Sequence, residues 1–146
     1  MPMPTKGYEY LEHTADAKFR AYGTTLEEAF QNAAVAMFDV MIDTGTISDE
    51  VSEKIELTSA DLDGLVVDWL SELLYLFEVE RVVFGKFKIG GITEMNGNYS
   101  LSAIAYGESL DLSRHKFDTE VKAVTYNSLK VEETMDGWVV QVVVDT

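Results

Sequence analysis

The sequence contains no cysteine and only two histidines among its 146 residues. Without cysteine the chain can form no disulfide, no thiolate zinc site and no cysteine nucleophile. A histidine-rich metal centre would need both His13 and His115 together with several carboxylates. The sequence also lacks a phosphate-binding loop of the Walker type, a dinucleotide-binding fingerprint and a Gly-x-Ser-x-Gly motif, so the enzyme classes that use them are not expected.

Long apolar runs are missing as well. No stretch approaches the ~20 apolar residues that span a bilayer, and the N-terminal residues lack the apolar segment of a signal peptide. These features favour a cytoplasmic protein with no membrane partner.

Positive charge is scarce. Eleven Lys and Arg oppose 26 Asp and Glu, which gives a formal charge of −15 at pH 7. Such an excess of carboxylates repels phosphate backbones, so strong direct binding of nucleic acid is not expected. The bases gather mainly in residues 81–130, where they are either solvated in the ordinary way or leave one face of mixed charge for a partner.

What is present is the composition of a folded protein. Apolar residues make up 47% of the chain, and the length suits one domain over residues 1–146. Alternating patterns predict strands over 7–12, 17–22 and 51–57. One apolar stripe predicts a helix from Thr24 or Thr25 to a point before Asp43, and a wider apolar surface predicts a buried helix from Ser59 or Asp61 through Phe77.

From residue 81 onward the pattern is that of β-structure. Residues 82–92 predict a strand with bulges at Gly85 and Gly90-Gly91, and Asn96-Gly97 and Asp136-Gly137 predict hairpin turns. Residues 120–132 predict another strand, and 138–144 are so uniformly apolar that a central strand is expected. The predicted class is α+β, with an antiparallel or mixed β-sheet and two main helices packed on it.

Oxygen ligands offer the most plausible chemistry. Asp16 ends the polar segment 13–16 between two predicted strands, and Asp145 precedes the terminal carboxylate of Thr146. If the last strand lies beside Asp16, these groups meet and would need a hard cation such as calcium or magnesium. The alternative is that they are exposed turn acids that bond to local backbone groups.

Lys122 is a second candidate, expected in the middle of the strand over 120–132. It is either a solvated residue of an edge strand or a cation that contacts an acidic partner or a phosphate. The pair His115-Lys116 has the same two interpretations.

Several segments, in order and over nearly the whole chain, carry a resemblance to the archease family. They are Tyr8-Glu9-Tyr10-Leu11-Glu12-His13-Thr14-Ala15-Asp16, Leu26-Glu27-Glu28-Ala29-Phe30, Trp69-Leu70-Ser71-Glu72-Leu73-Leu74-Tyr75, Ala105-Tyr106-Gly107-Glu108, Glu120-Val121-Lys122-Ala123-Val124-Thr125-Tyr126 and Gln141-Val142-Val143-Val144-Asp145. The resemblance implies a non-catalytic protein cofactor of the RtcB-type RNA-splicing ligase, which seals tRNA exons. Such a cofactor promotes guanylylation and multiple turnover of the ligase and broadens its use of nucleotides.

The resemblance also implies roles for particular residues. The family's metal site falls on Asp16 and Asp145, with Thr146 joining through its main chain or terminal carboxylate, and calcium is the expected ion, with magnesium or manganese as alternatives. The lysine important for ligase activation falls on Lys122. Glu12 and His13 are carried over as neighbours of the site.

The sequence departs from the family pattern at two positions. Asn127 stands where histidine is common, which retains hydrogen bonding but not proton transfer. Thr146 stands where an apolar residue is common, a difference that a main-chain ligand would tolerate.

Two other functions stay open. A small metal-dependent hydrolase would use Asp16 and Asp145 to hold an ion that activates water, with His13 moving protons. An acidic, chaperone-like interaction module would act on many unrelated clients, independently of Asp16.

Overall fold

The structure, a computed structural model, describes residues 7–12 and 16–146. Its elements follow the chain in the order β1 (Tyr8–Leu11), β2 (Ala17–Gly23), α1 (Leu26–Met41), the short 3₁₀ helix η1 (Thr44–Thr46), β3 (Val51–Ser59), α2 (Leu62–Glu80), β4 (Val82–Met95), β5 (Asn98–Ser109), β6 (Ala123–Thr134) and β7 (Gly137–Asp145).

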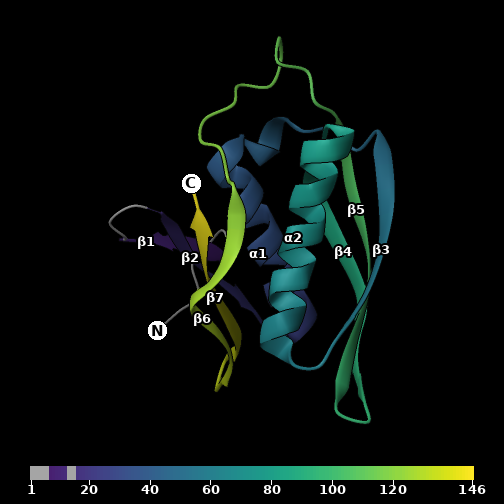
Figure 1. Ribbon diagram of the computed structural model, residues 1–146, viewed down its shortest axis with the longest axis vertical. Coiled ribbons are helices and arrows are strands. Elements are labelled where there is room, and N and C mark those ends of the chain that lie inside the picture. Colours follow the sequence, from purple (N-terminus) through teal and green to yellow (C-terminus); the bar gives the residue numbers. More distant parts are fainter. Residues whose placement is uncertain (1–6, 13–15) are drawn as a thin grey trace.

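The strands form two antiparallel sheets. The four-stranded sheet has the order β1-β2-β7-β6, and the three-stranded sheet has the order β3-β5-β4. Figure 1 shows the two helices between them, with the four-stranded sheet on the left and the three-stranded sheet on the right. The predicted α+β class, with antiparallel pairing and two main helices, is confirmed; the sequence did not indicate that the strands would divide into two sheets. As predicted, β7 is central, because β2 and β6 flank it.

Both helices begin at side-chain caps. The Thr25 hydroxyl accepts from the Glu28 N–H at 3.1 Å, and the Glu28 carboxylate accepts from the Thr24 N–H at 2.9 Å. Asp61 caps α2 by accepting from the Gly64 N–H at 2.7 Å. Such caps satisfy N–H groups that have no partner inside the helix, so both predicted helix starts are confirmed.

The core lies between the sheets and is made largely of helix side chains. Trp69 of α2 is fully buried, and its indole N–H donates to the Phe30 carbonyl at 3.0 Å, which joins the two helices. On the other side of α1, the β1 phenols anchor that strand: Tyr8 donates to the Asp39 carboxylate and Tyr10 donates to the Ala36 carbonyl at 2.8 Å. Burial raises the pKa of both phenols, so both stay protonated as donors.

The predicted irregularities of β4 are confirmed, because its register with β5 shifts between Phe84 and Lys86 and again between Ile89 and Gly91. The Asn96-Gly97 turn is also confirmed: both residues have positive φ, 55° and 83°, as a two-residue hairpin of this kind requires. The last hairpin turns at residues 135–136, one residue earlier than expected, and Gly137 is already the first residue of β7.

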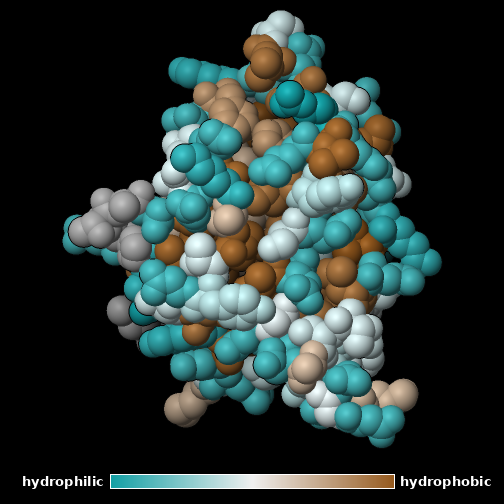
Figure 2. All heavy atoms as spheres, viewed as in Figure 1, coloured by the Kyte–Doolittle hydropathy of each residue, from teal (hydrophilic) through white to brown (hydrophobic). Residues whose placement is uncertain are grey.

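Hydrophobic side chains are exposed at several places on the surface, among them the upper end of the molecule. Figure 2 shows hydrophobic atoms there, over the loop after β5 and the C-terminal end of α2. Leu112 is 73% exposed and Val79 59% exposed. In the part of the chain that the structure describes, no helix combines the length and the apolar character needed to cross a bilayer.

Candidate functional site

Strand β7 brings distant parts of the chain together at one end of the four-stranded sheet. It pairs with β2 from Gly23 opposite Trp138 to Ala17 opposite Val144. On its other edge it pairs with the start of β6, where Ala123 lies opposite Asp145. The segment before β2 and the segment before β6 therefore flank the C-terminal end of β7.

Asp16 and Asp145 are the next residues beyond the last pair of the β2–β7 ladder. Val144 is fully buried and Asp145 is exposed, whereas Asp16 is partly exposed. Residues opposite each other in an antiparallel pair share a face of the sheet, and like charges in that position destabilise it. Continuing the register by one residue would place Asp16 opposite Asp145, and a cation between the two carboxylates would offset their repulsion. All the ligands here would be oxygen atoms, which suits a hard ion.

Lys122 adjoins the same end of β7, but its secondary structure was predicted wrongly. The residue precedes β6, which begins at Ala123, rather than lying in the middle of a strand. Its backbone N–H donates to the Asp145 carbonyl at 2.7 Å. The side chain is exposed, and no described carboxylate lies within ion-pair distance of it. The ammonium group is thus available to a partner, while its backbone is fixed to β7.

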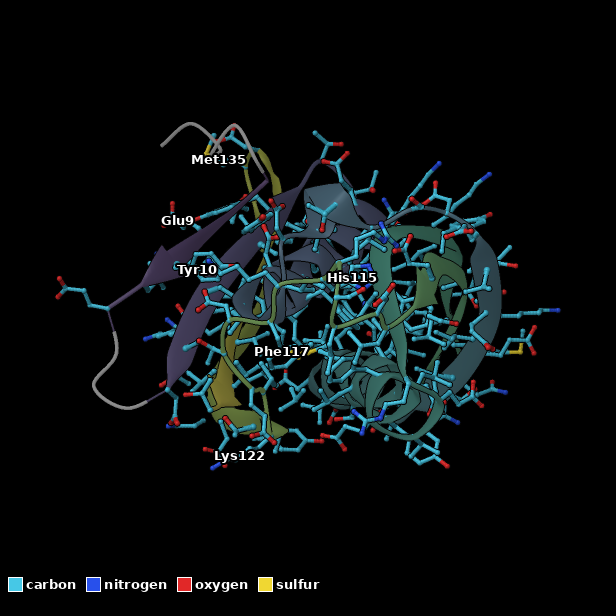
Figure 3. All side chains as sticks on the ribbon, turned by 90° about the horizontal axis from the view of Figure 1, so that it is seen from above. Glu9, Tyr10, His115, Phe117, Lys122 and Met135 are labelled. Atoms are coloured by element: carbon cyan, nitrogen blue, oxygen red, sulfur yellow. The ribbon has the colours of Figure 1, made fainter. Side chains whose placement is uncertain are left out.

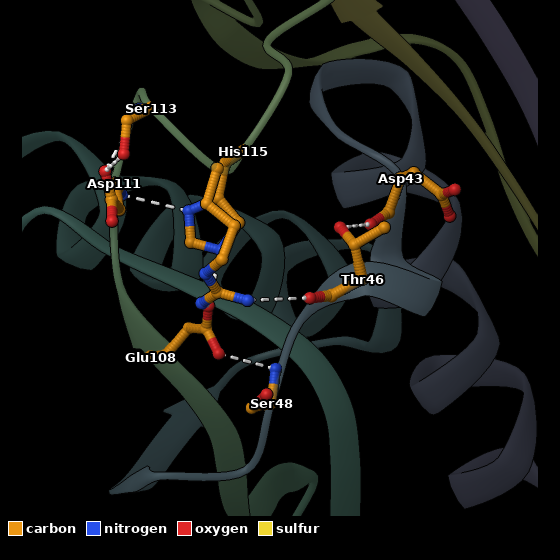
Figure 4. A network of polar contacts seen from close by, with 8 residues as sticks. Asp43, Thr46, Ser48, Glu108, Asp111, Ser113 and His115 are labelled. Carbon is orange, nitrogen blue, oxygen red and sulfur yellow. Dashed lines mark hydrogen bonds and ion pairs between the residues drawn. The ribbon is translucent and has the colours of Figure 1, made fainter.

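The loop between β5 and β6, which leads to Lys122, is held by a buried polar network (Figure 4). The Glu108 carboxylate accepts from the Ser48 N–H at 2.7 Å, lies 2.5 Å from His115 Nε2 and also contacts the Arg114 guanidinium. His115 Nδ1 accepts from the Asp111 N–H at 2.9 Å. Because Nδ1 is an acceptor, the proton of the neutral ring lies on Nε2, facing Glu108.

Burial is also the main reason why the pKa of His115 is lowered, and the Arg114 charge lowers it further. His115 is 1% exposed and Glu108 is 2% exposed. The sequence suggested that His115 is either a solvated surface residue or a cation presented to a partner. Both interpretations are wrong for this residue. It is a buried neutral group that links the loop to β5.

Aromatic packing holds the rest of the loop. Phe117 stacks on Phe77 of α2, with ring centroids 5.8 Å apart, and Val121 is 1% exposed. Both line a hollow of about 410 Å³, together with Leu110 and Leu112, and we call it the apolar hollow after these side chains. Three charged residues, Glu78, Arg81 and Glu120, also line it. Figure 3 shows His115 and Phe117 over the middle of the molecule and Lys122 at its rim. Val121, which lines the hollow, directly precedes Lys122 in the chain, so Lys122 follows the hollow's edge.

The remaining predicted site residues are only partly placed. Glu12 is exposed and follows β1, and His13 lies outside the described residues. Thr146 follows Asp145 and is partly buried. Within residues 7–12 and 16–146 no group of three or more histidine, aspartate and glutamate side chains is arranged to hold a metal ion, so any ion between Asp16 and Asp145 would need main-chain, terminal or further oxygen donors.

Sequence reasoning missed the Glu108–His115 pair. In β5 the alternation of buried Leu101, Ala103 and Ala105 puts Glu108 on the outer face, where a carboxylate is expected to be solvated. The only available signal was the presence of a histidine a few residues after a glutamate at the end of a predicted strand, and this is too common to be specific.

Comparison with known proteins gives one consistent family. The model of the Archease protein family matches residues 8–146. The chain is similar to the protein archease of Methanosarcina acetivorans, with 60% identity over 145 residues and 99% of each chain covered. The solution structure of protein 1598 from Methanobacterium thermoautotrophicum superposes with a TM-score of 0.86 at 39% identity, covering 97% of this chain and 100% of that one.

A more distant crystal structure, from Thermotoga maritima, shares the fold with a TM-score of 0.55 at 21% identity, covering 100% of this chain and 98% of that one. That protein is described as an archease and a possible chaperone.

Proposed function

The chain belongs to the archease family, and from this premise we propose that it is a non-catalytic activator of an RtcB-type RNA ligase. In this role it promotes guanylylation of the ligase and its repeated turnover in tRNA exon ligation. The chain itself forms no covalent intermediate; it contributes a surface that the ligase recognises. The setting for this role is the cytoplasm, with no membrane and no strong direct contact to RNA.

The observation that carries the proposal is the position of Asp16 and Asp145, each one residue beyond the end of the same β2–β7 ladder. These carboxylates, with Thr146 contributing through its main chain or terminal carboxylate, would hold a calcium ion; magnesium and manganese are the alternatives. Glu12 and His13 belong to the same connection between β1 and β2 and act as neighbours of the site. When bound, the ion offsets the repulsion between the carboxylates and fixes the end of the sheet.

Lys122 and the apolar hollow supply the contact with the ligase. Lys122 forms no ion pair with a described carboxylate, and the hollow with exposed Leu112 lies just before it in the chain. Exposed apolar surface rimmed by polar residues is the kind of surface that protein partners cover. The combination supports a protein partner rather than a small substrate.

Calcium titration tests the metal site. We expect the melting temperature to rise with calcium, because an ion that binds only the folded state stabilises it by about 2.7 kcal/mol at a concentration 100 times its dissociation constant. Asp16→Asn and Asp145→Asn should each abolish the shift. Asp68→Asn, on an exposed position of α2, is the matched control and should keep it. If calcium still raises the melting temperature of both variants, Asp16 and Asp145 do not hold the ion.

A guanylylation assay tests the activation. The ligase is incubated with GTP, with and without this protein, and the guanylylated fraction is followed over time. Lys122→Met should reduce the acceleration by about tenfold or more, as expected for loss of a charge-assisted contact. Lys88→Met, an exposed lysine of the three-stranded sheet, should not. If folded Lys122→Met and Asp16→Asn accelerate the reaction as the parent does, the proposed docking is wrong.

A chaperone-like role is the second candidate, favoured by the description of the Thermotoga maritima protein and by the exposed Leu112 and Val79. It predicts that the protein suppresses heat-induced aggregation of unrelated client proteins, and that Asp16→Asn suppresses it equally well. Light scattering with two unrelated clients separates the two functions.

A further inference from the structure

A row of polar side chains crosses the outer face of the four-stranded sheet. Arg20 of β2 lies directly opposite Gln141 of β7, which lies directly opposite Lys130 of β6. The neighbouring pairs on either side of Arg20, Phe19 with Val142 and Ala21 with Val140, are buried in the core. Because side chains alternate along a strand, the row points away from the helices. It lines a hollow of about 370 Å³.

The arginine in this row is fixed in place. Its Nε donates to Gln141 Oε1 at 2.8 Å, and Gln141 Nε2 donates to the Ser128 carbonyl at 2.7 Å. Gln141 is 3% exposed, and Ser128 has φ 54° in the irregular part of β6 between Thr125 and Lys130. A buried amide held by an irregular strand thus orients the guanidinium, while no described group takes its two terminal nitrogens.

The two cations that line the hollow, Arg20 and Lys130, form no ion pairs with described carboxylates. In a chain with a formal charge of −15, neither Arg20 nor Lys130 lies within 4.0 Å of a described carboxylate oxygen. Glu9 lies opposite Arg20 in the β1–β2 ladder but forms no ion pair with it. Two further carboxylates, Glu132 and Asp136, line the hollow without bonding to its cations. The hollow therefore has a cationic part and a part that accepts hydrogen bonds.

We propose that this hollow binds a phosphate monoester of a polyhydroxylated molecule, that is, a sugar phosphate. The terminal nitrogens of Arg20 form a planar fork that matches two phosphate oxygens, and Lys130 adds a point charge. Glu132 and Asp136 accept hydrogen bonds from hydroxyl groups, and Tyr22 provides an aromatic wall. The inference is independent of the ligase and of the cation at Asp16.

The size and charge of the hollow favour a small ligand over a polymer. Its volume lies within the range of about 300–1,000 Å³ that is usual for sites of small molecules. Nucleic acids are bound through many phosphate contacts, and this face offers two cations in the hollow of a strongly acidic chain. We expect a single phosphate group to contact both of them, since both line the same hollow.

Titrations followed by ¹H–¹⁵N NMR test the proposal, with ribose 5-phosphate, ribose and inorganic phosphate as the three probes. We expect ribose 5-phosphate to shift signals of residues around Arg20, Lys130 and Gln141, with a dissociation constant on the order of 1 mM or lower. Inorganic phosphate should shift the same signals more weakly, and ribose should not shift them. Equal binding of inorganic phosphate overturns the role of the hydroxyls; equal binding of ribose overturns the role of the phosphate.

Three variants make the test specific. Arg20→Lys keeps the charge but loses the fork, Lys130→Met loses a charge in the hollow, and Lys88→Met loses a charge on the other sheet. The first two should each weaken ribose 5-phosphate binding about tenfold or more, and the third should leave it unchanged; urea unfolding confirms that each variant is folded. Equal weakening in Lys88→Met, shifts that map away from the hollow, or no saturable shift would each overturn the proposal.

Discussion

Replacing Glu108 by glutamine should destabilise the fold, although the two side chains have nearly the same shape. The carboxylate of the parent protein accepts from the Ser48 N–H on one oxygen and from the protonated Nε2 of His115 on the other, where it also meets Arg114. A glutamine offers one carbonyl oxygen and one NH₂ group. In either orientation its NH₂ group faces a donor, so at least one buried N–H loses its acceptor and the guanidinium loses its counter-charge.

The size of the effect follows from these contacts. An unmet buried donor costs about 1–3 kcal/mol, and a hydrogen bond to a charged group contributes about 1.5–3 kcal/mol. Because Arg114 is half exposed, its contact with Glu108 adds little. We therefore expect the free energy of unfolding to fall by about 2–4 kcal/mol. At a urea dependence of about 2 kcal/mol per molar, in the middle of the usual range, the midpoint should fall by about 1–2 M.

Equilibrium unfolding in urea, followed by the fluorescence of the two tryptophans, measures this change. The matched control is Glu133→Gln, the same substitution at an exposed position of the β6–β7 hairpin, where surface changes stay within about 0.5 kcal/mol. The reasoning is refuted if Glu108→Gln loses no more stability than this control.

Three further predictions concern stability. Burial lowers the pKa of His115 below its ordinary value of 6.5, so as the pH falls the unfolded chain takes up a proton on this residue before the folded chain does. The free energy of unfolding should therefore fall as the pH drops from 6.5 through the folded pKa. Urea midpoints at several pH values should show this loss, and His115→Asn should make it smaller. Gly107→Ala should cost about 3 kcal/mol or more, because the new Cβ would lie 1.8 Å from the Val83 carbonyl oxygen; an unchanged melting temperature would contradict this. Thr25→Ala removes the cap of α1 and should cost about 1 kcal/mol in urea unfolding, whereas Thr25→Ser should cost less.

Much of the fold was predictable because its signals are local. The capping threonine of α1 and the Asn96-Gly97 turn each depend on a few neighbouring residues, and both were found where the sequence placed them. The division into two sheets was not predictable. It depends on which strands pair, and β2 pairs with β7 across almost the whole chain, a choice that alternation in either strand does not encode.

The same distinction explains the outcome at the candidate site. Val121 and Lys122 continue the alternation of β6, but Val121 is buried beside the apolar hollow rather than in the sheet. The predicted strand therefore began at residue 120, whereas β6 begins at Ala123. The closeness of Asp16 and Asp145 was a hypothesis from the sequence. The β2–β7 register places Asp16, just before β2, and Asp145, the last residue of β7, each one residue beyond the same strand pair. Whether a cation binds there stays a prediction, because backbone register alone does not create affinity.

The pairing of β7 with β2 has a consequence for synthesis on the ribosome. β2 emerges early, yet the strand that covers its free edge is made more than a hundred residues later. Until then the β1–β2 hairpin presents an open row of backbone donors and acceptors, which invites pairing with other nascent chains. The three-stranded sheet, whose strands all lie between residues 51 and 109, can assemble earlier. Heat or rapid overexpression should therefore harm newly made chains more than finished ones.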